Sequence, residues 1–447
     1  MVDGRLSPPT VNQLVLGASR LAKPADSRRA AAELLIETLE KRRTFDEAAA
    51  TVKAFDALTG PDRGFAYAMA SAAVRHLGII DKGLNHFLDR PLSSASPEAR
   101  ALLRTGASQL WCLGTSQHAA VSETVDAAKA WPKARRAAGL INAVLRKASR
   151  DHSQFKDARN TEIWPDWLHR VFLDSLGREA TERLAALQRR QAELHLTPKA
   201  GSAQDLADRL SGEATSTGQV TMQTSNTEMI EGYESGDWWV QDAAAALPAR
   251  LMQFEPGDTV IDLCAAPGGK TMQLAAAGAQ VTAIDRSAKR LKRVEANLER
   301  TGLAENVTIL AADAGTWKPE TPARHILLDA PCSALGTLRR HPEGAWIKRQ
   351  NEVAKYPEAQ SRLLKAAINM SASGGEILYC VCSPIRAEGV EVVETAIRTG
   401  LVERNPVGPE DAPGFEACIT DQGDVLTVPP KDDARFDAFF ISRLRVV

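Results

Sequence analysis

The sequence predicts a multidomain protein in which an all-α N-terminal domain is joined through an α/β linker region to a C-terminal α/β domain. The 447 residues are enough for two or three domains, each with its own core. Residues 27–150 carry apolar side chains at helical spacing, with no strand-like alternation. From Thr259 onward, short apolar runs alternate with helical patterns, which is typical of a parallel sheet covered by helices on both faces.

The composition argues against two broad classes of protein. Hydrophobic residues make up 44% and charged residues 25%, as in an ordinary globular chain, and no apolar run approaches the roughly 20 residues that span a bilayer. Six cysteines without disulfide-framework spacing indicate a reducing compartment. We therefore expect a cytoplasmic protein that does not act at a membrane, with residues 1–26 as a flexible N-terminus too polar for a secretory signal.

The net charge of −1 conceals an uneven distribution along the chain. Residues 1–150 contain 22 Lys and Arg against 14 Asp and Glu, whereas the remainder contains 33 against 42. A basic first third is typical of a module that docks on a polyanion such as a nucleic acid. A merely solvated surface is the alternative interpretation.

The N-terminal domain, residues 27–150, is expected to contain five to seven helices. Apolar residues three and four apart mark four of them, at residues 30–39, 63–77, 99–111 and 119–130. The linker region, residues 151–250, begins with a helical stretch from Trp164 to about Gln191. A polar segment, 201–226, should then hold short strands around a helix at 203–210.

The C-terminal domain, residues 251–447, alternates strands with helices. Parallel strands are predicted at 260–263, 280–284, 307–310, 326–328 and 376–380. Helices are predicted from residue 269 and at 289–301, 358–371 and 390–398. Two further segments, 425–428 and 437–443, are predicted to be antiparallel edge strands. The carboxyl ends of the parallel strands should meet at one edge, where open α/β folds bind their ligands.

Two cysteines follow neighbouring strands at this edge. Cys332 lies in Asp329-Ala330-Pro331-Cys332-Ser333 and Cys382 in Tyr379-Cys380-Val381-Cys382-Ser383, so both suit covalent chemistry on a substrate. Taken alone, each is more often a small buried apolar residue. Cys-x-Cys is poor zinc spacing and lacks a neighbouring His, so we expect no metal.

Basic and aromatic residues follow Cys332 closely in the sequence. Such a loop beside a thiol favours thiolate formation and the binding of phosphate and stacked bases. An ordinary solvated loop is the alternative interpretation. The residues concerned are Arg339, Arg340, His341, Trp346 and Lys348.

A glycine-rich turn, Cys264-Ala265-Ala266-Pro267-Gly268-Gly269-Lys270, leads from the first strand into a helix. Such a turn lets the backbone approach a ligand closely and points helix amides at it. It is neither the dinucleotide fingerprint nor a Walker A loop. Asp285 closes the second strand 23 residues after Asp262, a spacing typical of a carboxylate that binds a ribose, and Asp313 follows the third. A helix cap is the alternative role for each.

These motifs resemble those of the RNA cytosine-5 methyltransferases of the NOL/NOP/Sun superfamily, most closely the bacterial RsmB/Sun (Fmu) family, which methylates 16S ribosomal RNA. The turn at 262–270 resembles the family's S-adenosylmethionine loop. The segments around Cys332 and Cys382 are similar to the two cysteine motifs of the family, and 236–245 is also similar. Residues 118–121 and 140–146 resemble the NusB-like RNA-binding domain fused to this family.

The resemblance implies a Rossmann-like, S-adenosylmethionine-dependent methyltransferase domain and a NusB-like N-terminal domain. It implies that Cys382 adds to C6 of a single-stranded or flipped cytosine, which makes C5 nucleophilic, and that Cys332 assists proton removal and elimination. The expected partner is ribosomal RNA, naked or in an immature small subunit, bound by a monomer. The cofactor-binding residues implied are Cys264, Ala265, Ala266, Pro267, Gly268, Gly269, Lys270, Asp285, Asp313 and Asp329.

Three segments depart from the family pattern. Val381 stands where Thr is usual, Glu388-Gly389 where Glu-Asn is common, and residues 195–199 replace an Arg-Val-Asn segment. They leave the target nucleotide open. Methylation of transfer RNA, or a catalytically silent role as an RNA-binding ribosome-assembly factor, are the alternative functions. The intact Cys332 and Cys382 argue against the silent role.

Overall fold

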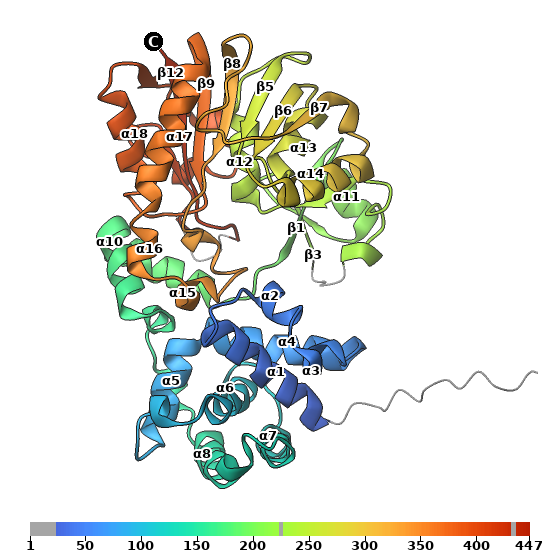
Figure 1. The fold of residues 1–447 in the computed structure, drawn as a ribbon, viewed down its shortest axis with the longest axis vertical. Coiled ribbons are helices and arrows are strands. Elements are labelled where there is room, and N and C mark those ends of the chain that lie inside the picture. Colours follow the sequence, from blue (N-terminus) through green and yellow to red (C-terminus); the bar gives the residue numbers. More distant parts are fainter. Residues whose placement is uncertain (1–23, 223–226, 431–434) are drawn as a thin grey trace, which may run out of the picture.

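The computed structural model describes residues 24–222, 227–430 and 435–447 of the chain. A helical part lies below a sheet-containing part in Figure 1, and α10 runs along one side between them. Within the described ranges, no helix is both long and apolar enough to cross a membrane. Most of the N-terminus expected to be flexible, residues 1–23, lies outside the described residues.

The helical domain, residues 24–150, is entirely α, as predicted. It contains eight α-helices rather than five to seven, because two very short helices were not evident from periodicity and because the helix predicted at 63–77 ends at Arg75, before α5 begins. The helices are α1 (Pro24–Leu39), α2 (Phe45–Ala49), α3 (Lys53–Asp56), α4 (Gly60–Arg75), α5 (Leu77–His86), α6 (Pro97–Trp111), α7 (Gln117–Ala130) and α8 (Ala138–Arg150).

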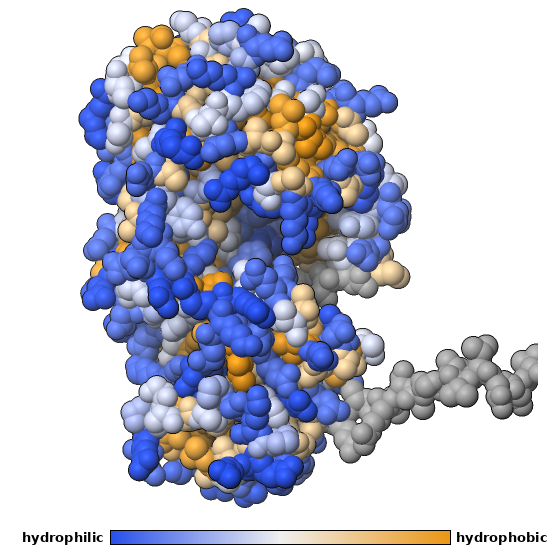
Figure 2. All heavy atoms as spheres, in the orientation of Figure 1, coloured by the Kyte–Doolittle hydropathy of each residue, from blue (hydrophilic) through white to orange (hydrophobic). Residues whose placement is uncertain are grey.

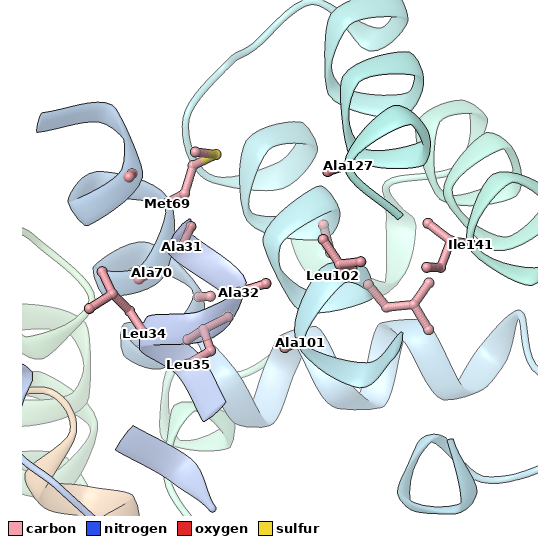
Figure 3. Close-up of a cluster of buried hydrophobic side chains, with 14 of the residues drawn as sticks. Ala31, Ala32, Leu34, Leu35, Met69, Ala70, Ala101, Leu102, Ala127 and Ile141 are labelled. Carbon is pink, nitrogen blue, oxygen red and sulfur yellow. The ribbon is translucent and has the colours of Figure 1, made fainter. Parts of the chain in front are cut away.

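The core of the helical domain is built from the apolar stripes of its longer helices. Leu34 and Leu35 of α1, Met69 of α4, Leu102 of α6 and Ile141 of α8 converge in its interior (Figure 3), and each is at most 1% exposed. Burial of such side chains stabilises the domain by about 1.5–3 kcal/mol each.

The linker region contains two helices, α9 (Ser153–Lys156) and α10 (Asp166–Gln188), followed by a small antiparallel sheet of order β2-β3-β1-β4. The strands are β1 (Leu194–Pro198), β2 (Glu213–Ala214), β3 (Val220–Met222) and β4 (Trp238–Val240), with α11 (Ala203–Leu210) packed beside them. The segment 195–199, which departs from the family pattern, therefore lies largely in an inner strand of this sheet, paired with both β3 and β4. Helix α12 (Ala243–Leu251) leads into the next domain.

The sheet domain, residues 259–447, contains the predicted Rossmann-like sheet. Its order is β10-β12-β9-β8-β5-β6-β7; strands β9 to β7 run parallel, and β12 is antiparallel to β9 and β10. The strands are β5 (Thr259–Leu263), β6 (Gln280–Asp285), β7 (Val307–Ala311), β8 (Ala323–Asp329), β9 (Ser371–Val381), β10 (Val402–Arg404), β11 (Val425–Leu426) and β12 (Phe440–Val446).

Helices cover both faces of this sheet because apolar side chains point alternately to each face. Val260 packs in one core with α12, α13 (Gly269–Ala276) and α14 (Ala288–Thr301). Ile261 packs in the other with α17 (Tyr356–Met370) and α18 (Val390–Ile397). The remaining short helices are α15 (Gly344–Ile347) and α16 (Gln350–Val353).

The edge strands differ from the prediction. The strand predicted at 437–443 begins only at Phe440, because the amide of Asp437 donates to Asp242 and that of Ala438 to the carbonyl of Gly336. The strand predicted at 425–428 ends at Leu426, because the amide of Val428 turns back to the Leu426 carbonyl. The three-residue β10 was not predicted.

The helical domain and the sheet domain are joined by buried polar contacts as well as by the chain. Arg75 of α4 donates to the main-chain carbonyls of Gln188, Arg190 and Arg339, at 3.2, 3.1 and 2.7 Å. Trp346 of α15 packs against the core of the helical domain. The loop that follows Cys332 is therefore held partly by the N-terminal domain.

Candidate active site

The predicted site residues come from the carboxyl ends of the parallel strands. The cofactor loop follows β5, Asp285 closes β6, Asp329 closes β8, and Cys382 directly follows β9. Because these strands are parallel neighbours, their ends meet at one edge of the sheet, as the sequence predicted.

The two cysteines meet at this edge. The Sγ atoms of Cys332 and Cys382 are 3.1 Å apart. Periodicity alone could not say whether Cys380 and Cys382 share a face. Strand β9 ends at Val381, so Cys380 stays buried in the sheet while Cys382 turns toward Cys332. The hydrogen bond with Cys382, together with burial, raises the pKa of Cys332 well above its usual value.

Asp329 lies between Lys270 of the cofactor loop and Cys380 of β9. Its Oδ2 accepts a 2.7 Å hydrogen bond from Nζ of Lys270, and its Oδ1 lies 3.4 Å from Sγ of Cys380. Burial acts to lower the pKa of Lys270, but the charge of Asp329 outweighs it and the pKa is raised. Lys270, which also lies over the ring of Phe439, is therefore a permanently charged link between the loop and Asp329.

The cofactor loop forms a tight turn at the start of α13. Gly268 has φ +102°, and a side chain there would press on Val294 of α14 at 3.1 Å, so glycine allows the loop to lie close to that helix. Asp262, just before the loop, is fully buried and accepts from Thr271 Oγ1 at 2.6 Å. Burial raises the pKa of Asp262 to about 7.

Asp285 faces the cofactor loop. Its Oδ2 accepts from the amide of Ala266 at 3.4 Å and lies 3.0 Å from Nη1 of Arg290, while Oδ1 accepts from the amide of Ser287 at 2.9 Å. The N-cap of α14 is Ser287, whose side chain accepts from the amide of Arg290. The capping role considered for Asp285 thus belongs to Ser287.

A cleft of about 810 Å³ opens beside the loop and Asp329. Its lining includes Ala265, Pro267, Gly269, Lys270 and Asp329. A close-approach turn with a carboxylate at the end of the next strand fits S-adenosylmethionine, whose ribose hydroxyls need acceptors.

Asp313 lies apart from these contacts. Its carboxylate is exposed, accepts from the amide of Gly315 at 2.8 Å and lies 3.6 Å from Arg362. No group of three or more His, Cys, Asp or Glu residues able to hold a metal ion is present in the described part of the chain.

Two of the basic residues after Cys332, Arg339 and Arg340, are paired internally and fit neither the solvated loop nor the phosphate-binding loop considered above, whereas His341 is exposed. Arg339 is 3% exposed, and Arg340 donates to Asp242 at 2.6 Å and to Asp437 at 3.0 Å. These contacts use the two guanidinium groups to join the linker region to the C-terminal segment. Asp242 and Asp437 each lie almost a hundred positions from these arginines in the chain, so the sequence offered no sign of the pairing.

Sequence reasoning also missed the contacts of Glu388. Its buried carboxylate accepts hydrogen bonds from Ser333 and Ser383, the residues that directly follow the two cysteines. The repeated Cys-Ser pair, at the ends of two adjacent strands, was the available signal. The next residue, Gly389, stands where the family commonly has Asn. A side chain there would meet the Phe440 ring at 2.5 Å, so this chain has no room for Asn at that position.

The fold and the site define an S-adenosylmethionine-dependent methyltransferase. Residues 249–445 match the family model described as 16S rRNA methyltransferase RsmB/F, and residues 25–150 match the NusB family. The chain belongs to the RsmB/F family, because curated relatives at least 30% identical are covered over most of their length.

Two such relatives are named ribosomal RNA small subunit methyltransferase B. The protein of Xanthomonas campestris pv. campestris is 32% identical over 413 residues, which cover 88% of this chain and 93% of the relative. The protein of Pseudomonas putida is 34% identical over 361 residues, which cover 74% of this chain and 80% of the relative.

Solved structures share the fold. The crystal structure of PH0851 has a TM-score of 0.74 at 22% identity and covers 95% of this chain and 99% of its own. The structure of NSun6 from Pyrococcus horikoshii with SFG has a TM-score of 0.53 at 19% identity. The match covers 63% of this chain and 98% of that one.

Proposed function

We propose that this protein transfers a methyl group from S-adenosylmethionine to C5 of a cytosine in RNA, through a covalent adduct between Cys382 and C6. The observation that carries the proposal is the 3.1 Å contact between the Sγ atoms of Cys332 and Cys382 at the ends of adjacent strands. Small-subunit ribosomal RNA is the proposed substrate, since the relatives are named for it. We further propose that the enzyme acts as a cytoplasmic monomer.

The cofactor supplies an electrophilic methyl group when bound. Its proposed ligands are the loop 264–270, with Asp285 as acceptor for the ribose hydroxyls and Asp313 after the neighbouring strand. Arg290, whose side chain is 56% exposed, would swing away from the Asp285 carboxylate to admit the ribose. Asp329, held by Lys270, is proposed to position the reacting groups between the loop and the cysteines.

The two cysteines have different tasks in this proposal. Cytosine C5 is a poor nucleophile, and addition of the Cys382 thiolate to C6 makes it an enamine-like carbon. Cys332, whose Sγ lies 3.1 Å from that of Cys382, stands beside the same carbon pair and acts in the later step. After methyl transfer, Cys332 as a thiolate accepts the C5 proton; the electron pair of that C–H bond forms the C5–C6 double bond, and the C6–Sγ bond breaks to release the Cys382 thiolate.

The N-terminal part is proposed to bind RNA. A groove of about 850 Å³ lies between α4 and the end of α10, and its lining includes Arg63, Arg75 and Arg189 but no carboxylate. Tyr67, 40% exposed, lines the same groove and offers a surface for base stacking. Figure 2 shows a largely hydrophilic face with apolar residues in small separate patches, which suits a polar partner.

The test is transfer of a radiolabelled methyl group from S-adenosylmethionine to deproteinised 16S ribosomal RNA, to small subunits and to bulk transfer RNA. Nuclease digestion and mass spectrometry would identify the methylated nucleoside. We expect 5-methylcytidine in ribosomal RNA. Methylation of transfer RNA alone would support the second substrate class, and no methylation of any RNA would favour the silent assembly factor.

A further inference from the structure

Glu388, in the loop between β9 and α18, has a buried carboxylate that contacts both cysteine loops. Its Oε2 accepts from the amide of Ser333 at 2.7 Å, and its Oε1 accepts from the hydroxyls of Ser333 and Ser383 at 2.5 and 2.8 Å. Gln360 of α17 donates to Oε2 at 3.1 Å. The residue is 0% exposed, so its carboxylate cannot touch a substrate in the cleft.

The two serines connect this carboxylate directly to the cysteines. Ser333 follows Cys332 and Ser383 follows Cys382, and the two hydroxyls lie 3.2 Å apart. Both cysteines lie beyond the ends of their strands, where the ladder of β8 and β9 no longer fixes the backbone. The hydrogen bonds to one charged group replace that ladder, and bonds to a charged acceptor are about twice as strong as neutral ones.

A second contact constrains the same loops. The amide of Gly336 donates to the carbonyl of Cys382 at 3.0 Å, and an added Cβ on Gly336 would meet the Ala438 carbonyl oxygen at 1.7 Å. The loop after Cys332 thus lies directly on the backbone of Cys382. Glu388 holds the residues next to the thiols, and Gly336 holds the loop behind them.

We propose that Glu388 is a positioning residue that sets the distance and orientation between the Cys332 and Cys382 thiols. This inference rests on the proposed function, because it assigns the geometry to a reaction in which both thiols act. Two steps then depend on Glu388: addition of Cys382 to C6, and the later elimination assisted by Cys332. Binding of RNA and of S-adenosylmethionine does not depend on it.

The test is the substitution Glu388→Gln in the full chain. The introduced amide keeps the shape of the side chain but replaces a carboxylate acceptor with a neutral group, so the hydrogen bonds that hold both cysteine loops should be about half as strong. We expect kcat to fall at least about tenfold at saturating RNA and cofactor, with both KM values within about twofold of the wild type. Formation of the denaturation-resistant protein–RNA adduct in a single turnover should slow by the same factor.

The matched control is Glu376→Gln. Glu376 is a buried carboxylate in β9, the strand that precedes the loop of Glu388, and it accepts from the amide of Gln253 at 3.0 Å. Its loss should lower the melting temperature without changing kcat. Equal losses of kcat in the two variants, or an unchanged kcat in folded Glu388→Gln, would overturn the proposal.

Ser333→Ala and Ser383→Ala provide a second test if Glu388→Gln does not fold. Each substitution removes one hydroxyl that donates to the Glu388 carboxylate, and each should lower kcat severalfold with unchanged KM. A wild-type kcat in both variants would count against the positioning role. Glu388→Asp keeps the charge but shortens its reach, so a positioning role predicts that Asp does not rescue kcat. If the wild type itself gives no adduct and no 5-methylcytidine, the proposed function fails instead.

Discussion

The Sγ atoms of Cys332 and Cys382 lie 3.1 Å apart although 50 positions separate the two cysteines in the chain. The contact exists because β8 and β9 are parallel neighbours and each cysteine lies just beyond the end of its strand. At this separation one thiol can act on the same pyrimidine ring that the other attacks. Substituting each cysteine in turn separates their functions.

Cys382→Ala is expected to abolish methyl transfer, lowering turnover on the order of a thousandfold or more. Without the thiolate, C6 addition cannot occur and C5 remains a poor nucleophile. Cofactor affinity measured by titration calorimetry should be unchanged, since Cys382 lies outside the loop. Cys418→Ala, a buried cysteine elsewhere in the sheet domain, is the control and should retain turnover. Comparable turnover in the two variants would refute the nucleophile assignment.

Cys332→Ala is expected to trap a covalent protein–RNA adduct. Addition and methylation can proceed through Cys382, but proton removal and elimination lose their assisting group. A denaturing gel should show a slower-migrating band that nuclease removes. The double variant Cys332→Ala/Cys382→Ala should show none. Absence of the band in the single variant would argue against this function for Cys332.

Asp285→Ala is expected to weaken cofactor binding roughly tenfold to a hundredfold, a loss of about 1.5–3 kcal/mol for ribose hydroxyls left without an acceptor. The KM for the cofactor should rise while kcat at saturation changes little. Ser287→Ala is the matched control: it removes the true N-cap of α14 and should cost about 1 kcal/mol of stability with cofactor affinity intact. The opposite pattern in calorimetry and melting curves would assign Asp285 to the helix instead.

The free energy of unfolding should fall as the pH is lowered, because His195 is then protonated. Burial lowers the pKa of His195 to about 4, although Asp242 partly opposes this. A depressed folded pKa means that the contribution is complete above the unfolded value of about 6.5 and is lost as pH falls toward 4, by roughly 3 kcal/mol. The raised pKa of Asp262 has the opposite effect, adding stability as the pH falls, and it is present in both the wild type and the His195→Gln variant. Denaturant titrations should therefore show that His195→Gln loses less stability than wild type between about pH 7 and pH 4; equal losses would contradict this.

The groove at α4 should contribute to the salt dependence of RNA binding. Arg63→Ala and Arg189→Ala are each expected to weaken binding and to reduce the slope of log K against log salt by about one for each phosphate left without its arginine. Arg398→Ala, outside the groove at the end of α18, is the charge-matched control. Slopes equal to wild type in the two groove variants would remove this surface from the RNA path.

The sequence predicted the features that depend on local patterns. The inner strands β5 and β6 were placed within one residue, because apolar runs of four or five residues are bounded by turn residues. The meeting of Cys332 and Cys382 followed from the rule that parallel strands end at one edge. The short β10 escaped notice because Glu403 and Arg404 interrupt any apolar pattern.

The contacts that hold the site could not be read from the sequence. Arg340 pairs with Asp437, 97 positions away, and Glu388 bonds Ser333, 55 positions away. Neither pairing has a periodicity or a motif, since each depends on where several elements pack. The basic residues after Cys332 were consequently interpreted as available to phosphate, whereas Arg339 is committed to internal contacts.

The three carbonyls bound by Arg75 bear on how the N-terminal domain can be studied. Deleting the chain up to about residue 155 removes the one guanidinium that ties the carbonyls of Gln188, Arg190 and Arg339 together, so the loop after Cys332 loses its link to the end of α10. A shortened enzyme would then lose turnover through a loosened catalytic loop even if its RNA contacts were dispensable. Deletion thus confounds affinity with loop integrity, and only surface substitutions that leave Arg75 in place can measure what the domain adds to substrate capture.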